Sequence, residues 1–574
     1  MFTALPQTRE AFEKLSWTEI EPWYRELAKT TLTPDTLESW LRQWSRLSAL
    51  VDETSTWLEI ATTRNTADEE LSRRRGQFLD EIFTHVQHFD QQIKQQLLAS
   101  GLEAENFALP LRKLRVDIEL FQAKNIPLLN EEKKLAEAYM SVSGAQTVLW
   151  EGDEIPITLL YPQMQDPDHR RRELAWRIFN ERKFEDRETV NEIWIKSVQV
   201  RQQIARNAGY TNYREYRWQQ MYRFDYTPDD CKAFHDVVEQ VIVPVASQFA
   251  EKRRRRLGVE RLRPWDIAVD PRASAAPRAI EDIDALLRQC AGLFYQIDPA
   301  LGGYFDTMIK EQCFDLEERA NKAPGGYMLQ LEVRQLPFIF GRVMSIADIV
   351  GLIVHEAGHA FHAFEARGLP YIHQRKESMM PMEFAEVASI GMEFIACMHL
   401  LSCGLCTKEE ARHIRLQMLE SQGLEGTLLA VPLIICGDAF QHWVYENPER
   451  AADPQAVGQQ WTELSRRFEP DIDWSGLEAV RRNGWQYILH FFDTPFYYIN
   501  YAFAIIGALQ VWRNYLRDPR GTIQQYRQAL SSGATRSLPE LYAAAGAKFA
   551  FDAPLLQELV QLVTGKIDEL EQEA

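Results

Sequence analysis

Apolar residues recur at steps of three and four over long parts of this 574-residue chain, the spacing of one face of an α-helix. Pro34 and Asp35 supply a helix-start signal, and the stripe that follows consists of Leu37, Trp40, Trp44, Leu47 and Val51. Charged, glutamine-rich stretches punctuated by leucine continue the pattern at residues 66–100 and 130–143. We therefore expect a mainly α-helical protein.

Two short stretches depart from helical spacing. Gly152 and Asp153 stand between apolar residues, which predicts a short β-hairpin. Residues 325–340, which open on Gly325, Gly326 and Tyr327, alternate in character and predict a pair of strands. After this pair the pattern is helical almost to the last residue, so we expect only small β-structure in the chain.

Composition narrows the classes of partner. The chain carries 64 Lys and Arg against 83 Asp and Glu, a formal net charge of −19, which disfavours nucleic acid and anionic membranes. The first residues lack a signal-peptide pattern, and no uninterrupted apolar run is long enough for a membrane span. Seven scattered cysteines fit reduced thiols. We expect a cytoplasmic protein, with nothing to indicate its oligomeric state.

The first chemical motif is His355-Glu356-Ala357-Gly358-His359, preceded by a helix-start signature at Ser345 and Asp348. Two histidines four residues apart project from one helical face, so both imidazoles can bind a single metal ion. Glu356, beside the first ligand, is placed to take a proton from a water on that metal. Such a site needs a third ligand from another element.

A second helix, predicted to start near Pro381, offers that ligand. Glu383, Glu386 and Glu393 are spaced by three and then seven residues, so their carboxylates share one face among Met, Phe, Val and Ile. Burying such a face is costly unless a cation neutralises it. We rank Glu386 first as ligand, assign Glu393 to orienting a ligand histidine, and hold Glu383 in reserve.

Two further features are a third histidine after the first motif and a histidine followed by three tyrosines later in the chain. His362 lies seven residues after His355 and is assigned to supporting a ligand or to packing. Further on, His490 precedes Pro495 and the tyrosines Tyr497, Tyr498 and Tyr501, with a helix predicted to begin near Pro495. Alone, this pattern is more typical of an aromatic core stripe; in a peptidase, phenol and imidazole groups could stabilise an oxyanion.

Taken in order, these motifs make the sequence similar to the thimet oligopeptidase family of zinc metallopeptidases, and more closely to its oligoendopeptidase F branch. The resemblance rests on residues 355–362, on residues 383–389, and on His490 with residues 495–501. Weaker similarity at residues 208–216 and 324–327 extends it over most of the chain from about residue 120 onward. Three ordered motifs make the resemblance specific.

The resemblance implies a mainly α-helical ellipsoid divided by a deep substrate channel, with a small β-sheet near a zinc site on the channel floor. That sheet would bind extended peptide, which points to Gly325, Gly326 and Tyr327 as substrate-binding residues. We divide the chain into an N-terminal helical lobe, residues 1–190, and a catalytic metallopeptidase domain, residues 191–574. Short unstructured oligopeptides would enter such a channel, whereas folded proteins would not.

The resemblance also implies roles for the motif residues. One Zn²⁺ per chain would be bound by His355, His359 and Glu386, with Glu356 as general base and then general acid. Oxyanion stabilisation would fall to His490 with tyrosines whose spacing differs from the thimet branch. We prefer Tyr497 and Tyr501 and keep Tyr498 as an alternative.

Three functions remain open from the sequence. The first is a zinc-dependent endopeptidase acting on oligopeptides through metal-activated water. The second is a zinc carboxypeptidase of similar channel architecture. The third is a non-catalytic peptide-binding scaffold stabilised by zinc, which is disfavoured because structural zinc sites usually have four protein ligands, commonly cysteines, and the motifs contain none.

Overall fold

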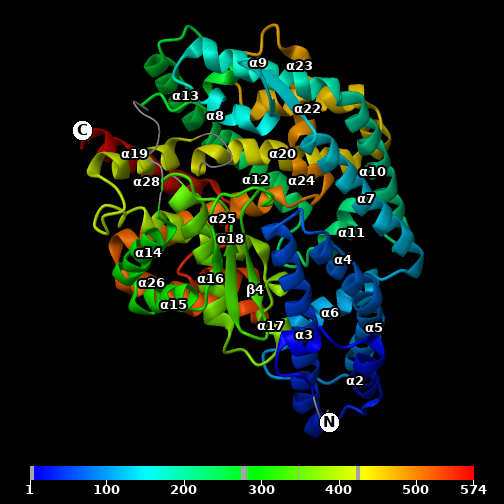
Figure 1. Cartoon of the computed structure of the whole chain (residues 1–574). Coiled ribbons are helices and arrows are strands. Elements are labelled where there is room, and N and C mark those ends of the chain that lie inside the picture. Colours follow the sequence, from blue (N-terminus) through cyan, green and yellow to red (C-terminus); the bar gives the residue numbers. More distant parts are fainter. Residues whose placement is uncertain (1–4, 273–279, 281, 347, 422–426, 574) are drawn as a thin grey trace. The chain divides into compact units, whose positions relative to one another are not determined.

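A computed structural model describes residues 5–272, 280, 282–346, 348–421 and 427–573 (Figure 1). The chain forms two compact units that interleave in sequence. Unit 1 comprises residues 1–119, 277–411 and 507–549, and unit 2 comprises residues 120–276, 412–506 and 550–574. The expectation of a mainly α-helical fold is confirmed, and the lobe boundary at residue 190 stays a prediction.

The N-terminal segment of unit 1 packs around the long helix α3 (Pro34–Arg64), which confirms the predicted apolar stripe and extends it. Leu37, Trp40, Trp44, Leu47 and Val51 are all buried in its core. The other α-helices of this unit are α1 (Arg9–Phe12), α2 (Trp17–Lys29), α4 (Glu69–Phe78), α5 (Thr84–Ser100), α6 (Ala108–Leu120), α14 (Ile283–Ile297), α15 (Pro299–Lys310), α16 (His355–Ala366), α17 (Ile372–Arg375), α18 (Met382–Ala396), α26 (Pro519–Leu530) and α27 (Leu538–Ala544).

A three-stranded sheet in unit 1 confirms the predicted strand pair. Strands β4 (Tyr327–Leu331) and β5 (Leu336–Phe340) pair antiparallel, with Tyr327 opposite Phe340. The short strand β3 (Phe314–Asp315) pairs parallel with β5, which gives the order β3-β5-β4. Helix α16 packs against both β4 and β5, so this sheet lies beside the helix that carries the two motif histidines.

Helix α3 and a cluster of cations hold the sheet in place. The Glu53 carboxylate accepts hydrogen bonds from the backbone N–H groups of Val333 and Arg334, where the chain turns from β4 to β5. At the end of β3, the Asp315 carboxylate meets three cations at 2.6–2.7 Å: Arg64, Arg319 and Lys322. The Lys322 side chain is completely buried, so Asp315 neutralises a charge that water cannot reach.

Replacing Asp315 by asparagine is expected to lower the free energy of unfolding by about 3–5 kcal/mol at neutral pH, because it leaves Lys322 buried and unpaired. Although burial opposes it, hydrogen bonding to the cations lowers the pKa of Asp315 below its usual range. The carboxylate therefore stabilises the wild type above the ordinary pKa of aspartate, and this contribution disappears as the pH falls through the lowered value.

Denaturant unfolding of the wild type and the variant at neutral and acidic pH tests this expectation, since the difference between them should shrink in acid. Glu318→Gln provides the control, because Glu318 pairs with Arg342 at 2.9 Å while its side chain is 49% exposed. An exposed pair of this kind contributes about 0–1 kcal/mol. Equal effects of the two substitutions would contradict the account of the buried cluster.

Unit 2 is also helical, and its hairpin of β1 (Thr147–Trp150) and β2 (Asp153–Pro156) confirms the predicted turn at Gly152. Its α-helices are α7 (Ile126–Gly144), α8 (Tyr161–Met164), α9 (His169–Glu185), α10 (Arg187–Asn207), α11 (Tyr213–Gln220), α12 (Pro228–Val241), α13 (Val243–Leu257), α20 (Val431–Glu446), α21 (Pro448–Ala451), α22 (Pro454–Phe468), α23 (Glu478–Arg482), α24 (Leu489–Phe492) and α28 (Ala553–Gln572). Helices α19 (Lys408–Glu420) and α25 (Tyr498–Arg517) continue from one unit into the other.

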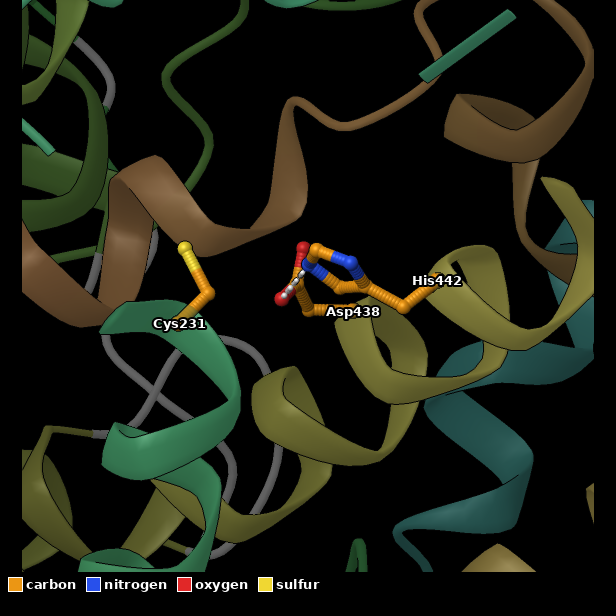
Figure 2. A group of neighbouring side chains, drawn as sticks. All are labelled: Cys231, Asp438 and His442. Carbon is orange, nitrogen blue, oxygen red and sulfur yellow. Dashed lines mark ion pairs between the residues drawn. The ribbon is translucent and has the colours of Figure 1, made fainter. Parts of the chain in front are cut away.

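Helix α20 runs through the core of unit 2. It belongs to the stretch Leu428–Glu446, which is long and apolar enough to cross a membrane. However, 83% of the apolar part of this stretch is buried inside the protein. Core packing against α12 and α22 accounts for its apolar composition. Two polar residues of α20, Asp438 and His442, nevertheless lie in this core beside Cys231 of α12 (Figure 2).

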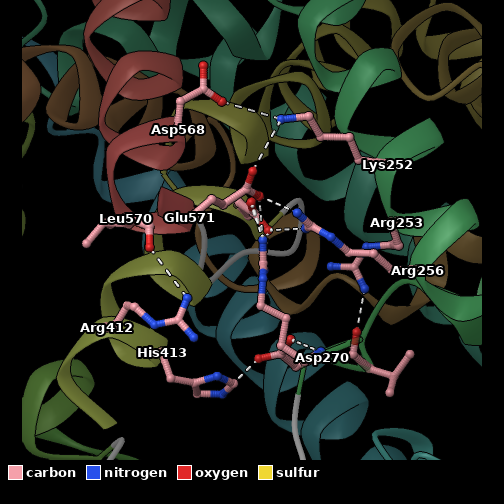
Figure 3. Close-up of polar contacts among 12 residues, drawn as sticks. Lys252, Arg253, Arg256, Asp270, Arg412, His413, Asp568, Leu570 and Glu571 are labelled. Carbon is pink, nitrogen blue, oxygen red and sulfur yellow. Dashed lines mark hydrogen bonds and ion pairs between the residues drawn. The ribbon is translucent and has the colours of Figure 1, made fainter. Parts of the chain in front are cut away.

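The last helix of the chain, α28, is held to unit 2 by charged contacts (Figure 3). Glu571 pairs with Arg256 of α13, and Lys252 on the same helix lies 3.7 Å from Asp568. Arg412 of α19 donates a hydrogen bond to the backbone carbonyl of Leu570. These contacts fix the C-terminal helix against α13 and against the part of α19 that belongs to unit 2.

Candidate metal and catalytic site

The three predicted metal ligands meet between α16 and α18 in unit 1. His355 and His359 lie one turn apart on α16, with ring centroids 5.1 Å apart. Oε2 of Glu386, on α18, lies 3.7 Å from Nε2 of each histidine. The ligand atoms all lie within 4.8 Å of one another. Since zinc binds such atoms at about 2.0–2.2 Å, the set fits one zinc ion and leaves a position for water or substrate.

The closeness of the two helices depends on Gly358, to which the sequence analysis assigned no role. A Cβ atom at this position would lie 2.5 Å from the Cα of Ser389 and 2.7 Å from the carbonyl oxygen of Ala388. Only glycine therefore lets the backbone of α18 approach α16 this closely. The glycine inside the histidine motif thus helps to bring Glu386 to the two imidazoles.

Hydrogen bonds orient the candidate ligands. Nδ1 of His355 lies 2.5 Å from Oε1 of Glu393, as predicted for the third acid of the α18 face. This contact leaves Nε2 free to face Glu386, the arrangement in which a carboxylate fixes the tautomer of a ligand histidine. The hydroxyl of Ser389 lies 3.1 Å from Oε2 of Glu386 and can donate to it.

Replacing Glu393 by glutamine is expected to weaken zinc binding about 10- to 100-fold, because the charged acceptor that holds His355 is lost. Competition with a chelator measures this affinity. Glu383→Gln is the matched control, since Glu383 is also a buried acid of α18 but lies outside the group of three converging ligands. An unchanged affinity in the Glu393 variant, or a larger loss in the Glu383 variant, would contradict the ligand assignment.

Glu356 occupies the position expected of a general base. It follows His355 on α16 and is 9% exposed. Burial raises the pKa of Glu356 to about 7, with Glu386 adding to the rise while His355 and the backbone N–H of Met328 in β4 oppose it. A carboxyl group with a pKa near neutral can both accept and return a proton.

A further acid, Glu377, belongs to the surroundings of this site and was missed in the sequence. Burial, together with the charges of Glu356 and Glu386, raises the pKa of Glu377 to about 7. It lies in the short 3₁₀ turn Glu377–Met379 just before α18. No motif or helical spacing links it to the other acids, so only the three-dimensional structure identifies it.

The remaining predicted residues of unit 1 lie in two places. His362 lies in the core, and Gly325, Gly326 and Tyr327 lie at the start of β4 or just before it. His362 is 3% exposed, and burial lowers its pKa to about 3, so it is a neutral core histidine beside Phe384. Gly325 has φ +95°, and Gly326 packs so closely on Leu352 that a Cβ would lie 2.3 Å from its Cδ1. The Tyr327 hydroxyl lies 2.5 Å from Thr63 Oγ1, which fixes the start of β4.

His490 and the three tyrosines lie together in unit 2. Rings of Tyr497, Tyr498 and Tyr501 have centroids 5.7, 5.1 and 5.9 Å from that of His490. Tyr498 is 2% exposed and packs against Gly437, whereas Tyr497 and Tyr501 are partly exposed. Tyr498 therefore belongs to the core, and the other two rings reach the surface of their unit.

The predicted helix start near Pro495 is wrong by three residues. Helix α25 begins at Tyr498, so Tyr497 precedes the helix instead of sharing its face with Tyr501. The cause is Phe496, whose φ of +67° places it in the left-handed region. Gln441 accepts its backbone N–H at 2.5 Å and Arg223 donates to its carbonyl, so contacts from distant parts of the chain hold this turn.

The chain is thus a mainly helical protein in which two histidines and a glutamate converge as possible metal ligands beside a second, buried glutamate. The comparisons with known proteins agree: the model for peptidase family M3 matches residues 163–283 and 303–561, and the model for the M3 N-terminal domain matches residues 8–121. The chain belongs to peptidase family M3. The resemblance read from the motifs is confirmed.

Individual relatives place the chain near the oligoendopeptidase F branch. An oligoendopeptidase F homolog of Borreliella burgdorferi is 23% identical over 449 residues, covering 74% of this chain and 72% of the relative. Among solved structures, PZ peptidase A with an inhibitor has a TM-score of 0.86 at 24% identity, covering 100% of this chain and 99% of its own. A putative oligoendopeptidase F from Bacillus anthracis has a TM-score of 0.81 at 23% identity, covering 99% and 97%.

Proposed function

We propose that this peptidase is a zinc-dependent endopeptidase that cleaves short, unstructured oligopeptides. The observation that carries the proposal is the convergence of His355, His359 and Glu386 within 4.8 Å, with Glu356 buried next to the first ligand. Two histidines and a glutamate, with one position left open, are a donor set of catalytic zinc sites rather than of closed structural ones. This disfavours the non-catalytic scaffold.

The proposed chemistry divides the work between the ion and the chain. Zinc, when bound, supplies a Lewis acid for the scissile carbonyl and for the attacking water. Glu356 accepts the proton of that water at its carboxylate and returns it to the leaving amine. Glu393 keeps His355 in the tautomer that presents Nε2 to the ion.

We assign substrate binding to the side of β4 that faces away from β5. In the order β3-β5-β4, this strand pairs with β5 alone among the described strands, so its other side can accept an extended peptide. The Met328 backbone lies beside Glu356, which would bring a peptide on this strand to the general base. We propose that the donors to the oxyanion are His490, Tyr497 and Tyr501. Tyr498 is left out because its side chain is buried in the core.

A peptide of about ten residues, blocked at both ends, separates the endopeptidase from the carboxypeptidase. Mass spectrometry after incubation should detect internal cleavage of the blocked peptide. The same peptide with free ends is the control for exopeptidase activity. Cleavage confined to the C-terminus of the free peptide would replace the endopeptidase by the carboxypeptidase, and no cleavage of either peptide would contradict both.

A further inference from the structure

A second set of metal-binding side chains lies in unit 2, on residues that the proposed peptidase chemistry does not use. Helices α12 and α20 pack against each other, and Figure 2 shows Cys231 from the first with Asp438 and His442 from the second. One ligand atom of each, a sulfur, a carboxylate oxygen and a ring nitrogen, lies within 4.8 Å of the others. All three residues are buried, with exposures of 0%, 0% and 2%.

Two polar atoms of this cluster lack hydrogen bonds to the described residues. Oδ1 of Asp438 has no hydrogen-bond partner among the described residues, although Asp438 is completely buried. Nε2 of His442 lies 3.2 Å from Oδ2 of Asp438 without the geometry of a hydrogen bond. A buried polar atom left in this way costs about 1–3 kcal/mol. Such atoms in native proteins require an explanation, and an ion is one that satisfies both.

We propose that Cys231, Asp438 and His442 bind a divalent transition-metal ion, with Zn²⁺ the best fit. Thiolate, imidazole and carboxylate together are typical zinc donors, and zinc holds them at about 2.0–2.3 Å. The set offers three protein ligands instead of the four that are usual in structural zinc sites. Because all three residues are buried, such an ion would link α12 to α20 and would satisfy the two buried polar atoms.

His235 supports this assignment from just outside the ligand group. Its Nε2 lies 2.8 Å from Oδ2 of Asp438, so one carboxylate oxygen is engaged and Oδ1 remains for the ion. Carboxylate ligands are commonly oriented by such a hydrogen bond. His235 is four residues after Cys231, so α12 presents a ligand and its supporting histidine on one face. His442 is likewise four residues after Asp438, so α20 presents two ligands on one face.

The contacts of Arg214 differ between a cluster that binds a metal ion and one that does not. Its Nη1 lies 3.2 Å from Nδ1 of His442 and also pairs with Glu446. Without an ion, Arg214 would donate to Nδ1 and the ring proton would sit on Nε2, facing Asp438. With an ion on Nε2, the ring proton would lie on Nδ1, and Arg214 would keep only its ion pair with Glu446 among these contacts. The two arrangements therefore predict different metal contents of the chain, and this content can be measured.

The position of the cluster gives the ion a structural purpose within unit 2. The His442 ring lies 5.4 Å from that of Phe496, the residue whose left-handed backbone sets the start of α25. Gln441, the neighbour of His442 on α20, accepts the Phe496 N–H. An ion that fixes α20 therefore also supports the turn that carries Tyr497.

Metal analysis of the full chain tests the proposal. The wild type should contain two zinc ions per chain, and His359→Ala and Cys231→Ser should each lose one. Cobalt substitution identifies the second site, because only a thiolate ligand gives an intense near-ultraviolet charge-transfer band. That band should be present in the wild type and in His359→Ala, and absent from Cys231→Ser.

Cys436→Ser is the matched control, since Cys436 is a buried cysteine of α20 outside the ligand group and its replacement should leave the band unchanged. A wild type that binds a single metal ion, lost in His359→Ala, and that shows no thiolate band would overturn the proposal. This result does not depend on folding of the Cys231 variant. Failure of the proposed peptidase site would appear separately, as two zinc ions per chain still bound in His359→Ala.

Discussion

Replacing Glu356 by glutamine is expected to reduce peptide hydrolysis by about 100- to 10,000-fold while zinc remains bound at His355, His359 and Glu386. Glutamine keeps the size of the side chain but cannot accept a proton from water. Burial holds the pKa of Glu356 at about 7, so the carboxylate that is lost is one suited to proton transfer near neutral pH. Measurements of kcat/KM and zinc content on the same preparation test both parts.

Glu365→Gln is the matched control for this variant. Glu365 lies on the same helix but pairs with Arg527 at 2.7 Å instead of facing the ligand group. Its replacement should leave hydrolysis near the wild-type rate. Appreciable turnover by the Glu356 variant would remove this residue from the role of general base, and loss of zinc from it would show that the substitution disturbs the ligands.

Replacing Gly358 by alanine is expected to lower the free energy of unfolding by about 1–3 kcal/mol and to weaken zinc binding. The new Cβ would lie 2.5 Å from the Ser389 backbone, so α16 and α18 must move apart. That movement carries Glu386 away from both histidines. Thermal unfolding and competition for zinc with a chelator measure the two effects.

Gly391→Ala, on α18, separates this clash from the general effect of alanine in a helix. The nearest atom to its added Cβ is Cε2 of Tyr526, at 4.0 Å, which is an ordinary contact. Because alanine favours helix over glycine by about 0.5–1 kcal/mol, this variant should be as stable as the wild type or more so. If Gly358→Ala behaved in the same way, close approach at Gly358 would not be what positions Glu386.

The features that could be predicted from the sequence are those that depend on local spacing. Two histidines four residues apart share a helical face wherever that helix packs, and the acids of α18 follow the same rule. The contact between His355 and Glu393 follows from the prediction that the histidines of α16 and the acids of α18 face one another. The stripe of α3 and the turn at Gly152 likewise depend on short segments.

The features that could not be predicted depend on distant contacts. The left-handed backbone of Phe496 is held by Gln441 and Arg223, and no local signal reports those partners. Cys231 and Asp438 each lie on a helix with a histidine four residues later, but nothing in the sequence places the two helices side by side. The role of Gly358 appears only once Ser389 is seen to face it.

The most direct test of the account is hydrolysis of the doubly blocked peptide before zinc removal by a chelator, after it, and after zinc is restored. Cleavage by the wild type should stop on removal of zinc and return when zinc is restored, and His359→Ala should stay inactive at every step. Undiminished cleavage by the chelated protein, or wild-type cleavage by His359→Ala, would contradict this expectation.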